Sequence, residues 1–324
     1  MRIVVIGGTG HIGSYLSPRL IEAGHEVICV SRGVSKPYQE QEAWRAIRFV
    51  TLDRRDAEAD GTFGARIAEL GAEAVVDLTC YTPESARALV EALRGRTRHF
   101  LHCGTIWVHG ARAGQVTMEE TPREPFGDYG LRKAAIERYL LEEFTNSGFP
   151  ATVIHPGHLV GPGWAPINPA GNFNLQVFSD LASSEEVLLP NHGRETVHHV
   201  HADDVAQLFE RAIGAPGVCR GEAFHAVSPA PLSLRQFAEE MAEWLGSEPR
   251  LRFLPYEEWR THFSEKDARV TWDHIHHSPN CSIEKARRLL GYEPNYSSVA
   301  AVQEAIGWMV DQGRVIGAPG VPAA

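Results

Sequence analysis

The stretch IVVIGGTGHIGSYLSPRLIEAGHEV, residues 3–27, decides how the chain begins to fold. An apolar run leads into Gly7, Gly10 and Gly13, and an amphipathic segment follows. Glycines at this spacing allow a tight turn, close approach of a pyrophosphate and close packing of a helix on a strand. We therefore expect a dinucleotide site formed by Gly7, Thr9, Gly10, His11, Ile12 and Gly13. A purely structural glycine turn is the alternative.

The composition is that of a globular protein with a large core, because 43% of the 324 residues are hydrophobic. The net charge of -10 gives no basic footprint for nucleic acid. No apolar run reaches the roughly 18 residues of a membrane span. The five cysteines are scattered and form no CxxC pair. We expect a cytoplasmic protein that acts on a small molecule, without nucleic acid or a membrane as partner.

Apolar, strand-like runs alternate with helix-like segments through the first half of the chain. We expect strands at 2–6, 26–31, 46–53, 74–79, 99–104 and 151–157, and helices at 12–23, 61–70, 83–94 and 129–144. Continuous apolar strands that alternate with helices favour a parallel sheet covered on both faces. The sequence therefore predicts an α/β fold with a doubly wound parallel sheet.

The pattern changes after residue 160. A loop rich in Gly, Pro and Asn spans 161–174, and the segments 232–246 and 282–294 have helical spacing. We expect a dinucleotide-binding core over 1–165, which 197–228 rejoins. A smaller C-terminal α/β lobe for substrate is expected over 166–196 and 229–312, followed by a tail at 313–324.

The end of the second strand bears on the choice of cofactor. An acid that binds the ribose of NAD usually stands there, but this chain has Ser31 followed by Arg32. A serine and an arginine can both bind a 2′-phosphate, which favours NADP. NAD stays possible if Arg32 stacks on the adenine instead. Asp53 either binds the adenine amino group or closes the third strand. Arg54, Leu78 and Pro156 are expected to complete the cofactor site.

Tyr129 and Lys133 lie four residues apart in a segment with helical spacing. Both side chains therefore share one face of a helix. The lysine ammonium can lower the pKa of the tyrosine and bind the ribose of the nicotinamide. A tyrosine tuned in this way can exchange a proton with a substrate hydroxyl near neutral pH.

Taken together, these motifs resemble the extended short-chain dehydrogenase/reductase family, in particular its NAD-dependent epimerase/dehydratase branch. The resemblance is carried by GGTGHIG (7–13), HCGTIWVHG (102–110), YGLRK (129–133), VIHPGHLVGPG (153–163), HADDVA (201–206) and ARRLLGYEP (286–294). It implies an enzyme with a Rossmann sheet and a catalytic triad of Thr105, Tyr129 and Lys133. It also implies a homodimer, by analogy with family members.

The residues after Thr105 narrow the expected reaction. Related dehydratases and decarboxylases carry acids there, whereas this chain has Ile106 and Trp107, which cannot transfer a proton. Hydride exchange between an alcohol and a ketone needs no such acid. We therefore expect an NAD(P)-dependent epimerase or ketoreductase, an isomerase or oxidoreductase acting on a sugar nucleotide or a related polar metabolite. A non-catalytic or regulatory protein of the same fold that binds a dinucleotide or RNA is the alternative.

Several positions differ from the family pattern or lie near the expected substrate. His109 and His155 replace a tyrosine and an arginine, and Arg194 does not align with the arginine that binds a uridine diphosphate. The substrate is expected to contact Tyr81, Thr105, Ile106, Trp107, His158 and Asn174. The histidines around 198–201 and 274–277 do not have the spacing of a zinc site, so no metal is expected. Asp203 and Asp204 are interpreted as helix-capping residues.

Overall fold

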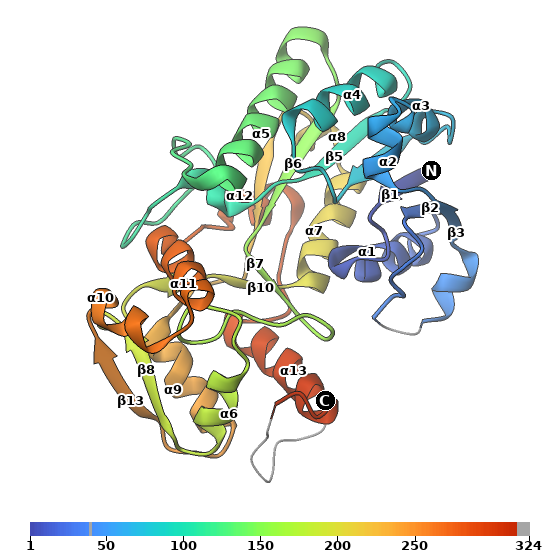
Figure 1. Cartoon of the computed structure of the whole chain (residues 1–324). Helices are drawn as coiled ribbons and strands as arrows, with labels where there is room; N and C mark the ends of the chain where they lie inside the picture. The colour runs from blue at the N-terminus through green and yellow to red at the C-terminus, as the bar shows by residue number, and fades with distance from the viewer. Residues whose placement is uncertain (39–40, 316–324) are drawn as a thin grey trace.

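The computed structural model describes residues 1–38 and 41–315. Within these residues, seven strands form one sheet in the order β11-β6-β5-β4-β1-β2-β3, and all neighbouring pairs are parallel. The strands are β1 (Arg2–Ile6), β2 (Glu26–Ser31), β3 (Arg48–Thr51), β4 (Ala74–Asp77), β5 (His99–Cys103), β6 (Ala151–Pro156) and β11 (Ala223–Ala226). The α/β class and the doubly wound parallel sheet are confirmed (Figure 1).

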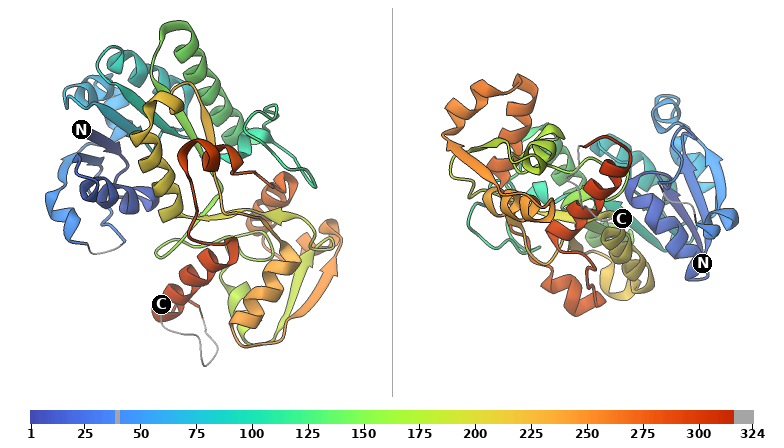
Figure 2. Two further views of the ribbon diagram at one scale, coloured as in Figure 1. Left: turned by 180° about the vertical axis from the view of Figure 1, so that it is seen from behind. Right: turned by 90° about the horizontal axis from the view of Figure 1, so that it is seen from below.

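The sheet is covered on both faces because alternate residues of each apolar strand point to opposite sides. Ile3 and Val5 pack in one core cluster, while Val4 and Ile6 pack in another. The first face is covered by α1 (His11–Glu22), α7 (Ala202–Gly214), α8 (Pro216–Cys219) and α12 (Glu284–Leu290), seen from behind in Figure 2. The second face is covered by α2 (Arg54–Ala59), α3 (Phe63–Ala68), α4 (Pro83–Leu93) and α5 (Gly127–Ser147). Two short turns lie in the connections, η1 (Glu42–Ala46) between β2 and β3 and η2 (Ile106–His109) between β5 and α5.

A third core cluster lies in the lobe below the sheet in Figure 1. Its helices are α6 (Gln176–Ala182), α9 (Leu234–Trp244), α10 (Tyr256–Trp259), η3 (Arg260–His262), α11 (Glu265–His277) and α13 (Ser298–Asp311). The strands form three small sheets, which pair β7 (His158–Val160) with β10 (His199–His201), β8 (Glu186–Pro190) with β13 (Arg250–Leu254), and β9 (Thr196–Val197) with β12 (Leu232–Ser233). The smaller C-terminal lobe is therefore present.

The limits of the two parts stay a prediction, although the core clusters bear on them. Strand β11 and helix α7 pack with the large sheet, as expected for residues 197–228. Residues from Cys281 to Tyr292, which we expected in the lobe, contribute Ile283, Ala286 and Leu290 to the cluster on the first face of the sheet. Most of the expected tail, residues 316–324, lies outside the described residues.

The start of α7 differs from the expectation for Asp203 and Asp204. The N-cap is His201, whose side chain accepts a hydrogen bond from the backbone N–H of Asp203 at 3.0 Å. Asp203 instead pairs with Arg19 of α1 at 2.6 Å. Asp204 is buried and accepts hydrogen bonds from the backbone of residues 295 and 296. Both carboxylates therefore interact with residues that are distant in the sequence, and His201 is the residue that caps α7.

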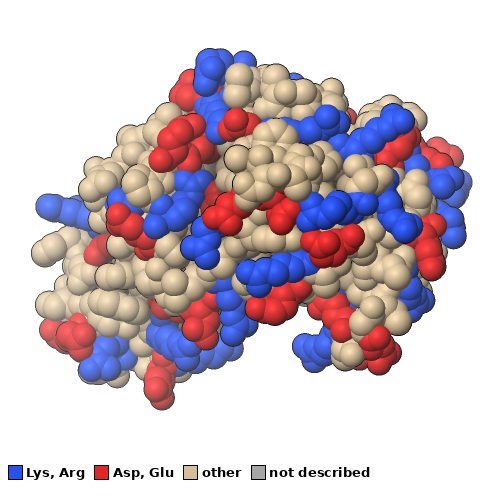
Figure 3. Space-filling view, turned by 90° about the horizontal axis from the view of Figure 1, so that it is seen from above, with Lys and Arg blue, Asp and Glu red and all other residues tan. Residues whose placement is uncertain are grey.

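Two surface properties bear on possible partners. In the described part of the chain, no helix combines the length and the apolar character that a membrane crossing requires. Acidic and basic side chains are interspersed across the face shown in Figure 3. That face offers no continuous basic surface to a nucleic-acid backbone.

Candidate active site

The glycine loop joins β1 to the N-terminus of α1. Gly7 has a positive φ of 86°, and its carbonyl accepts a hydrogen bond from the N–H of Gly10 at 2.9 Å. A Cβ atom at Gly13 would lie 2.5 Å from both the carbonyl oxygen of Gly7 and the Cα of Gly8. Gly13 therefore lets the helix approach the loop, as the spacing predicted.

A pocket of about 700 Å³ opens at this loop and at the carboxyl ends of β1, β2, β3 and β4. Ligands of open parallel sheets bind at this edge. Among the residues expected to bind the cofactor, the lining includes Gly7, Thr9, Gly10, Ser31, Arg32, Asp53 and Arg54. The pocket is also lined by seven residues that the sequence pattern does not predict, Val34, Ser35, Arg55, Phe63, Thr79, Thr82 and Ser85. None of these seven residues belongs to a sequence motif. They come together because the order of the strands places their segments at the same edge of the sheet.

The rim of the pocket near β2 and β3 combines cationic side chains with a capping carboxylate. Arg32 and Arg55 are exposed, and within residues 1–38 and 41–315 neither forms an ion pair. The Ser31 hydroxyl accepts a hydrogen bond from the N–H of Gly33 at 3.3 Å. The Asp53 carboxylate accepts one from the N–H of Arg55 at 2.8 Å and caps α2. Of the two roles considered for Asp53, the structure therefore displays the strand-end turn.

Arg54 lines the pocket, but its charge is already compensated. Its guanidinium donates to the buried carboxylate of Asp77 at 2.7 and 2.9 Å and to Glu58 at 2.6 Å. Burial acts to lower the pKa of Arg54, but Asp77 outweighs it and raises the pKa. A guanidinium engaged in this way supports the floor of the pocket, and because its Nη2 has no partner among the described residues, its contact with the cofactor stays a prediction.

The remaining residues expected at the cofactor are placed by packing. Ile12 is buried in the core cluster of the first face, and Leu78 packs against that cluster. Pro156 is buried at the end of β6, opposite Ala226 of β11. His11 stacks on Trp164 at a centroid distance of 4.9 Å, and burial lowers the pKa of His11 to about 4. These four residues are absent from the lining of the pocket.

Lys133 lies on the buried face of α5 and is only 2% exposed. Its ammonium donates to the carbonyl oxygen of Cys103 at 2.7 Å and to that of Cys80 at 2.8 Å. It also lies 4.9 Å from the ring centroid of Tyr81 and 6.0 Å from that of Tyr129. Burial lowers the pKa of Lys133. The lysine is thus held at the carboxyl edge of β4 and β5.

Tyr129 and Thr105 meet beside this lysine. Tyr129 is 43% exposed, but partial desolvation of its phenol still raises the pKa of Tyr129, while the neighbouring Thr105 side chain acts in the opposite direction. The Thr105 hydroxyl also accepts a hydrogen bond from the N–H of Trp107 at 3.3 Å. The pKa of Tyr129 is thus raised in this arrangement, and the lowering expected from the Lys133 ammonium stays a prediction. The phenol keeps its proton at neutral pH.

Aromatic and imidazole rings surround the other side of Tyr129. Trp107 packs edge-on against Tyr129 at 5.8 Å and stacks on His277 at 4.0 Å. Its indole N–H donates to Nε2 of His158 at 3.4 Å. His274 lies 5.1 Å from His158, ring to ring. Burial lowers the pKa of His274 and of His277 to about 4, so both rings are neutral at neutral pH.

Three other residues expected at the substrate have different surroundings. Ile106 is 3% exposed and packs in the core cluster of the first face, so the expected substrate contact is corrected. Asn174 accepts a hydrogen bond from the N–H of Gln176 at 3.0 Å, which is a loop-structuring role. Tyr81 is 54% exposed and lines the pocket at the glycine loop.

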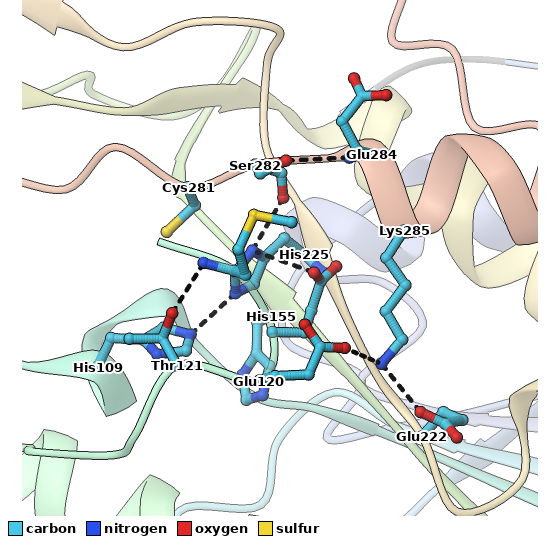
Figure 4. A network of polar contacts seen from close by, with 12 residues as sticks. His109, Glu120, Thr121, His155, Glu222, His225, Cys281, Ser282, Glu284 and Lys285 are labelled. Carbon is cyan, nitrogen blue, oxygen red and sulfur yellow. Dashed lines mark hydrogen bonds and ion pairs between the residues drawn. The ribbon is translucent and has the colours of Figure 1, made fainter. Parts of the chain in front are cut away.

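A cluster of buried histidines lies behind Thr105, between β6, β11 and η2. Nε2 of His109 is 2.8 Å from Nε2 of His225, and the His155 ring lies 6.3 Å from that of His225 (Figure 4). Burial lowers the pKa of His109 to about 3 and that of His225 well below its ordinary value. In the described residues, no group of three His, Cys, Asp or Glu side chains is arranged to hold a metal ion. His109 and His225 therefore form a buried, hydrogen-bonded pair of imidazoles.

A parallel sheet with a glycine loop at its carboxyl edge, beside a Tyr-Lys helix, defines an NAD(P)-dependent enzyme of the extended short-chain dehydrogenase/reductase type. The chain belongs to the NAD dependent epimerase/dehydratase family, whose sequence model matches residues 3–224.

Individual relatives agree with this assignment. The chain is 26% identical to a 2′-dehydrokanamycin reductase of Streptomyces kanamyceticus, over 97% of this chain and 86% of the relative. It is 27% identical to a UDP-glucose 4-epimerase of Mycolicibacterium smegmatis, over 79% of this chain and 86% of the relative. A crystal structure of dTDP-glucose 4,6-dehydratase from Bacillus anthracis in complex with NAD superposes with a TM-score of 0.72. That structure is 16% identical and covers 96% of this chain and 97% of its own, so it bears on the fold alone.

Proposed function

We propose that the protein is an NADP-dependent ketoreductase that interconverts a ketone and a secondary alcohol on a polar ring substrate. The substrate is a sugar nucleotide or a related metabolite. The proposal is carried by the convergence of Thr105, Tyr129 and Lys133 at the carboxyl edge of β4 and β5, beside the glycine-loop pocket. When bound, the nicotinamide supplies or accepts the hydride.

The protein side chains handle the proton and the oxygen. A phenol with a raised pKa keeps its proton at neutral pH, so Tyr129 is suited to donate a proton to a carbonyl oxygen. The Thr105 hydroxyl, which lies close enough to the phenol to influence its pKa, would bind the same oxygen. The Lys133 ammonium would hold the ribose hydroxyls of the nicotinamide half. This division of roles favours the reducing direction.

The choice of NADP rests on the rim of the pocket. Ser31, Arg32 and Arg55 line it together, and the two guanidiniums are not neutralised by a carboxylate of the described chain. Charge-assisted hydrogen bonds to a phosphate are about twice as strong as neutral ones. A 2′-phosphate on the adenine ribose would therefore find two free partners.

The substrate side supports a ring-shaped ligand. Trp107 and the neutral rings of His158 and His274 lie around Tyr129, and Phe173 is 47% exposed beside His274. Aromatic faces pack well on the apolar face of a ring, and neutral imidazoles can bind its hydroxyls. Trp107 and His158 are therefore the residues we assign to substrate orientation, together with Thr105.

The test combines the bound nucleotide with turnover. NADPH and NADH oxidation are measured with 2′-dehydrokanamycin, and UDP-glucose is assayed for epimerisation. We expect NADPH-dependent reduction, and a loss of about 100-fold or more in Tyr129→Phe. Undiminished turnover of Tyr129→Phe would refute the triad. Tightly retained NAD with conversion of UDP-glucose would favour an epimerase, and salt-sensitive RNA binding without turnover would favour the non-catalytic alternative.

We also propose a cytoplasmic homodimer. Helix α5 exposes Leu131 by 52%, and an exposed apolar side chain on this helix suits a contact with a second copy. Sedimentation at micromolar concentration tests this proposal, and a monomer would refute it.

A further inference from the structure

The backbone of Thr105 is bonded to a histidine that no motif of the reaction includes. Its N–H donates to Nδ1 of His155 at 2.9 Å, and both residues are buried. Thr105 stands at the end of β5 and His155 near the end of β6, on neighbouring parallel strands. The peptide that carries the Thr105 hydroxyl is therefore fixed by a side chain of the neighbouring strand β6.

The second ring nitrogen of His155 sets its tautomer. Nε2 lies 3.0 Å from Oε1 of Glu137, a buried carboxylate on the inner face of α5. A backbone N–H can only donate, so Nδ1 must carry the lone pair, and the proton stands on Nε2 toward the carboxylate. Burial acts to raise the pKa of Glu137, but His155 and Arg123 outweigh it and hold the pKa well below its usual range.

The carboxylate is itself anchored. Arg123 contacts both oxygens of Glu137, one of them at 3.1 Å through Nε. The same guanidinium donates to the carbonyl of Thr121 at 2.7 Å, in the segment that leads into α5. A continuous series of hydrogen bonds thus runs from Arg123 through Glu137 and His155 to the peptide of Thr105.

The close approach of the imidazole depends on a glycine. A Cβ atom on Gly104 would lie 2.4 Å from Nδ1 of His155 and 2.9 Å from Cγ1 of Val153. Such distances are far below van der Waals contact, so any side chain at 104 would displace the ring. Gly104 and His155 therefore form one structural unit under Thr105.

We propose that His155 is a positioning residue: its Nδ1 holds the Thr105 peptide so that the hydroxyl faces Tyr129, and Glu137 and Arg123 hold the required tautomer. The inference rests on the proposed function, because it gives Thr105 its role. A proton on Nδ1 would place two donors face to face and release the Thr105 peptide.

The first test examines the tautomer itself. In ¹⁵N-histidine spectra of the wild-type protein, assigned by loss of the signal in His155→Asn, we expect Nε2 protonated and Nδ1 unprotonated. A proton on Nδ1 of His155 would overturn the inference without touching the proposed reaction.

The second test separates the two nitrogens by substitution. The asparagine amide in His155→Asn can place an acceptor near the position of Nδ1, whereas glutamine in His155→Gln reaches toward Glu137. We expect His155→Gln to lower kcat of NADPH-dependent 2′-dehydrokanamycin reduction about 10- to 100-fold, with the KM for NADPH unchanged. His155→Asn should retain most of kcat. The control is His99→Asn, a buried histidine of β5 that contacts Thr152 at 2.8 Å.

A readout without substrate distinguishes failure of the inference from failure of the proposed function. The ring signal of Tyr129 is followed in ¹³C-tyrosine spectra and assigned with Tyr129→Phe. Thr105→Val should shift it, and His155→Gln and Gly104→Ala should shift it in the same direction. Gly214→Ala, which has nothing within 4 Å of the added Cβ, should not. If the Tyr129 signal shifts in Thr105→Val but not in His155→Gln or Gly104→Ala, the inference is overturned. If it does not shift in Thr105→Val, both the Thr105–Tyr129 pairing and the inference are overturned.

Discussion

The ammonium of Lys133 lies 2.7 Å from the carbonyl oxygen of Cys103, so the lysine of the catalytic helix is tied to the end of the neighbouring strand. A second bond at 2.8 Å ties it to Cys80 at the end of β4. The charge of the lysine thus sits at the junction of two strands, 4.9 Å from the ring centroid of Tyr81, which lines the pocket at the glycine loop. Loss of these two hydrogen bonds should therefore weaken both the fold at the carboxyl ends of β4 and β5 and the proposed reaction.

We therefore expect Lys133→Met to lower both stability and turnover. Two buried carbonyls lose a charged donor, which costs about 1–3 kcal/mol in the free energy of unfolding. Urea denaturation measures this cost, and NADPH oxidation should fall by at least about 100-fold. The matched control is Lys285→Met, whose ammonium pairs with the more exposed Glu222 at 2.9 Å and should cost less than about 1 kcal/mol. Equal effects of the two variants would contradict the assigned role.

The raised pKa of Tyr129 predicts opposite pH dependences for the two directions of the reaction. Reduction needs the protonated phenol, which is the dominant form from neutral pH upward to the raised pKa, so its kcat should stay flat between pH 7 and 9. Oxidation needs the phenolate, whose fraction rises about tenfold per pH unit below the pKa. Initial rates in both directions measure this, and a reduction rate that falls near pH 7 would contradict it.

Replacing Arg32 or Arg55 should discriminate between the two cofactors. Loss of a charge-assisted bond to a 2′-phosphate weakens binding by about 1.5–3 kcal/mol, or roughly 10- to 100-fold in the Kd of NADPH. The Kd of NADH should change little. Arg48→Ala serves as control, because Arg48 is an exposed arginine of β3 that does not line the pocket. Equal losses for NADPH and NADH would mean that the arginines contact another part of the nucleotide.

The buried histidines predict acid sensitivity of the fold. Burial lowers the pKa of His198 and His274 to about 4 and that of His199 to about 3, whereas the unfolded chain titrates near 6.5. These neutral rings stabilise the fold fully above pH 6.5. Their contribution is lost as the pH falls from 6.5 toward 4, because the unfolded state binds protons that the fold does not.

Each such histidine should lower the free energy of unfolding by about 1.4 kcal/mol per pH unit below pH 6. Urea midpoints at pH 8, 6.5 and 5.5 measure how steeply the free energy of unfolding depends on pH. The variant His274→Gln should make this dependence less steep by the contribution of one titrating histidine. A stability that does not change between pH 7 and 5 would contradict the burial of these rings.

The local elements of the site could be predicted from sequence because their signals are short-range. The glycine spacing of 7–13 specifies a turn that only a few backbone conformations allow, and the interval from Tyr129 to Lys133 is one helical turn. The alternation of apolar strands and helices specified the doubly wound class in the same way.

Contacts between distant segments required the tertiary structure. Arg54 meets Asp77 across 23 residues, and Thr105 meets His155 across 50, because parallel strands bring their carboxyl ends to one edge. Neither pairing follows a helical or strand repeat in the sequence. From the sequence alone, Arg54 is therefore expected at the cofactor, and His155 is noticed only because it replaces an arginine of the family motif.

By itself, then, the sequence determined the strand–loop–helix that binds the dinucleotide and the helix that carries tyrosine and lysine, since both follow from local geometry. The tertiary structure decided that the pKa of Tyr129 is raised and that a histidine accepts the hydrogen bond of the Thr105 peptide. Desolvation and buried hydrogen bonds depend on what surrounds a group in space, and chain order alone does not specify those surroundings.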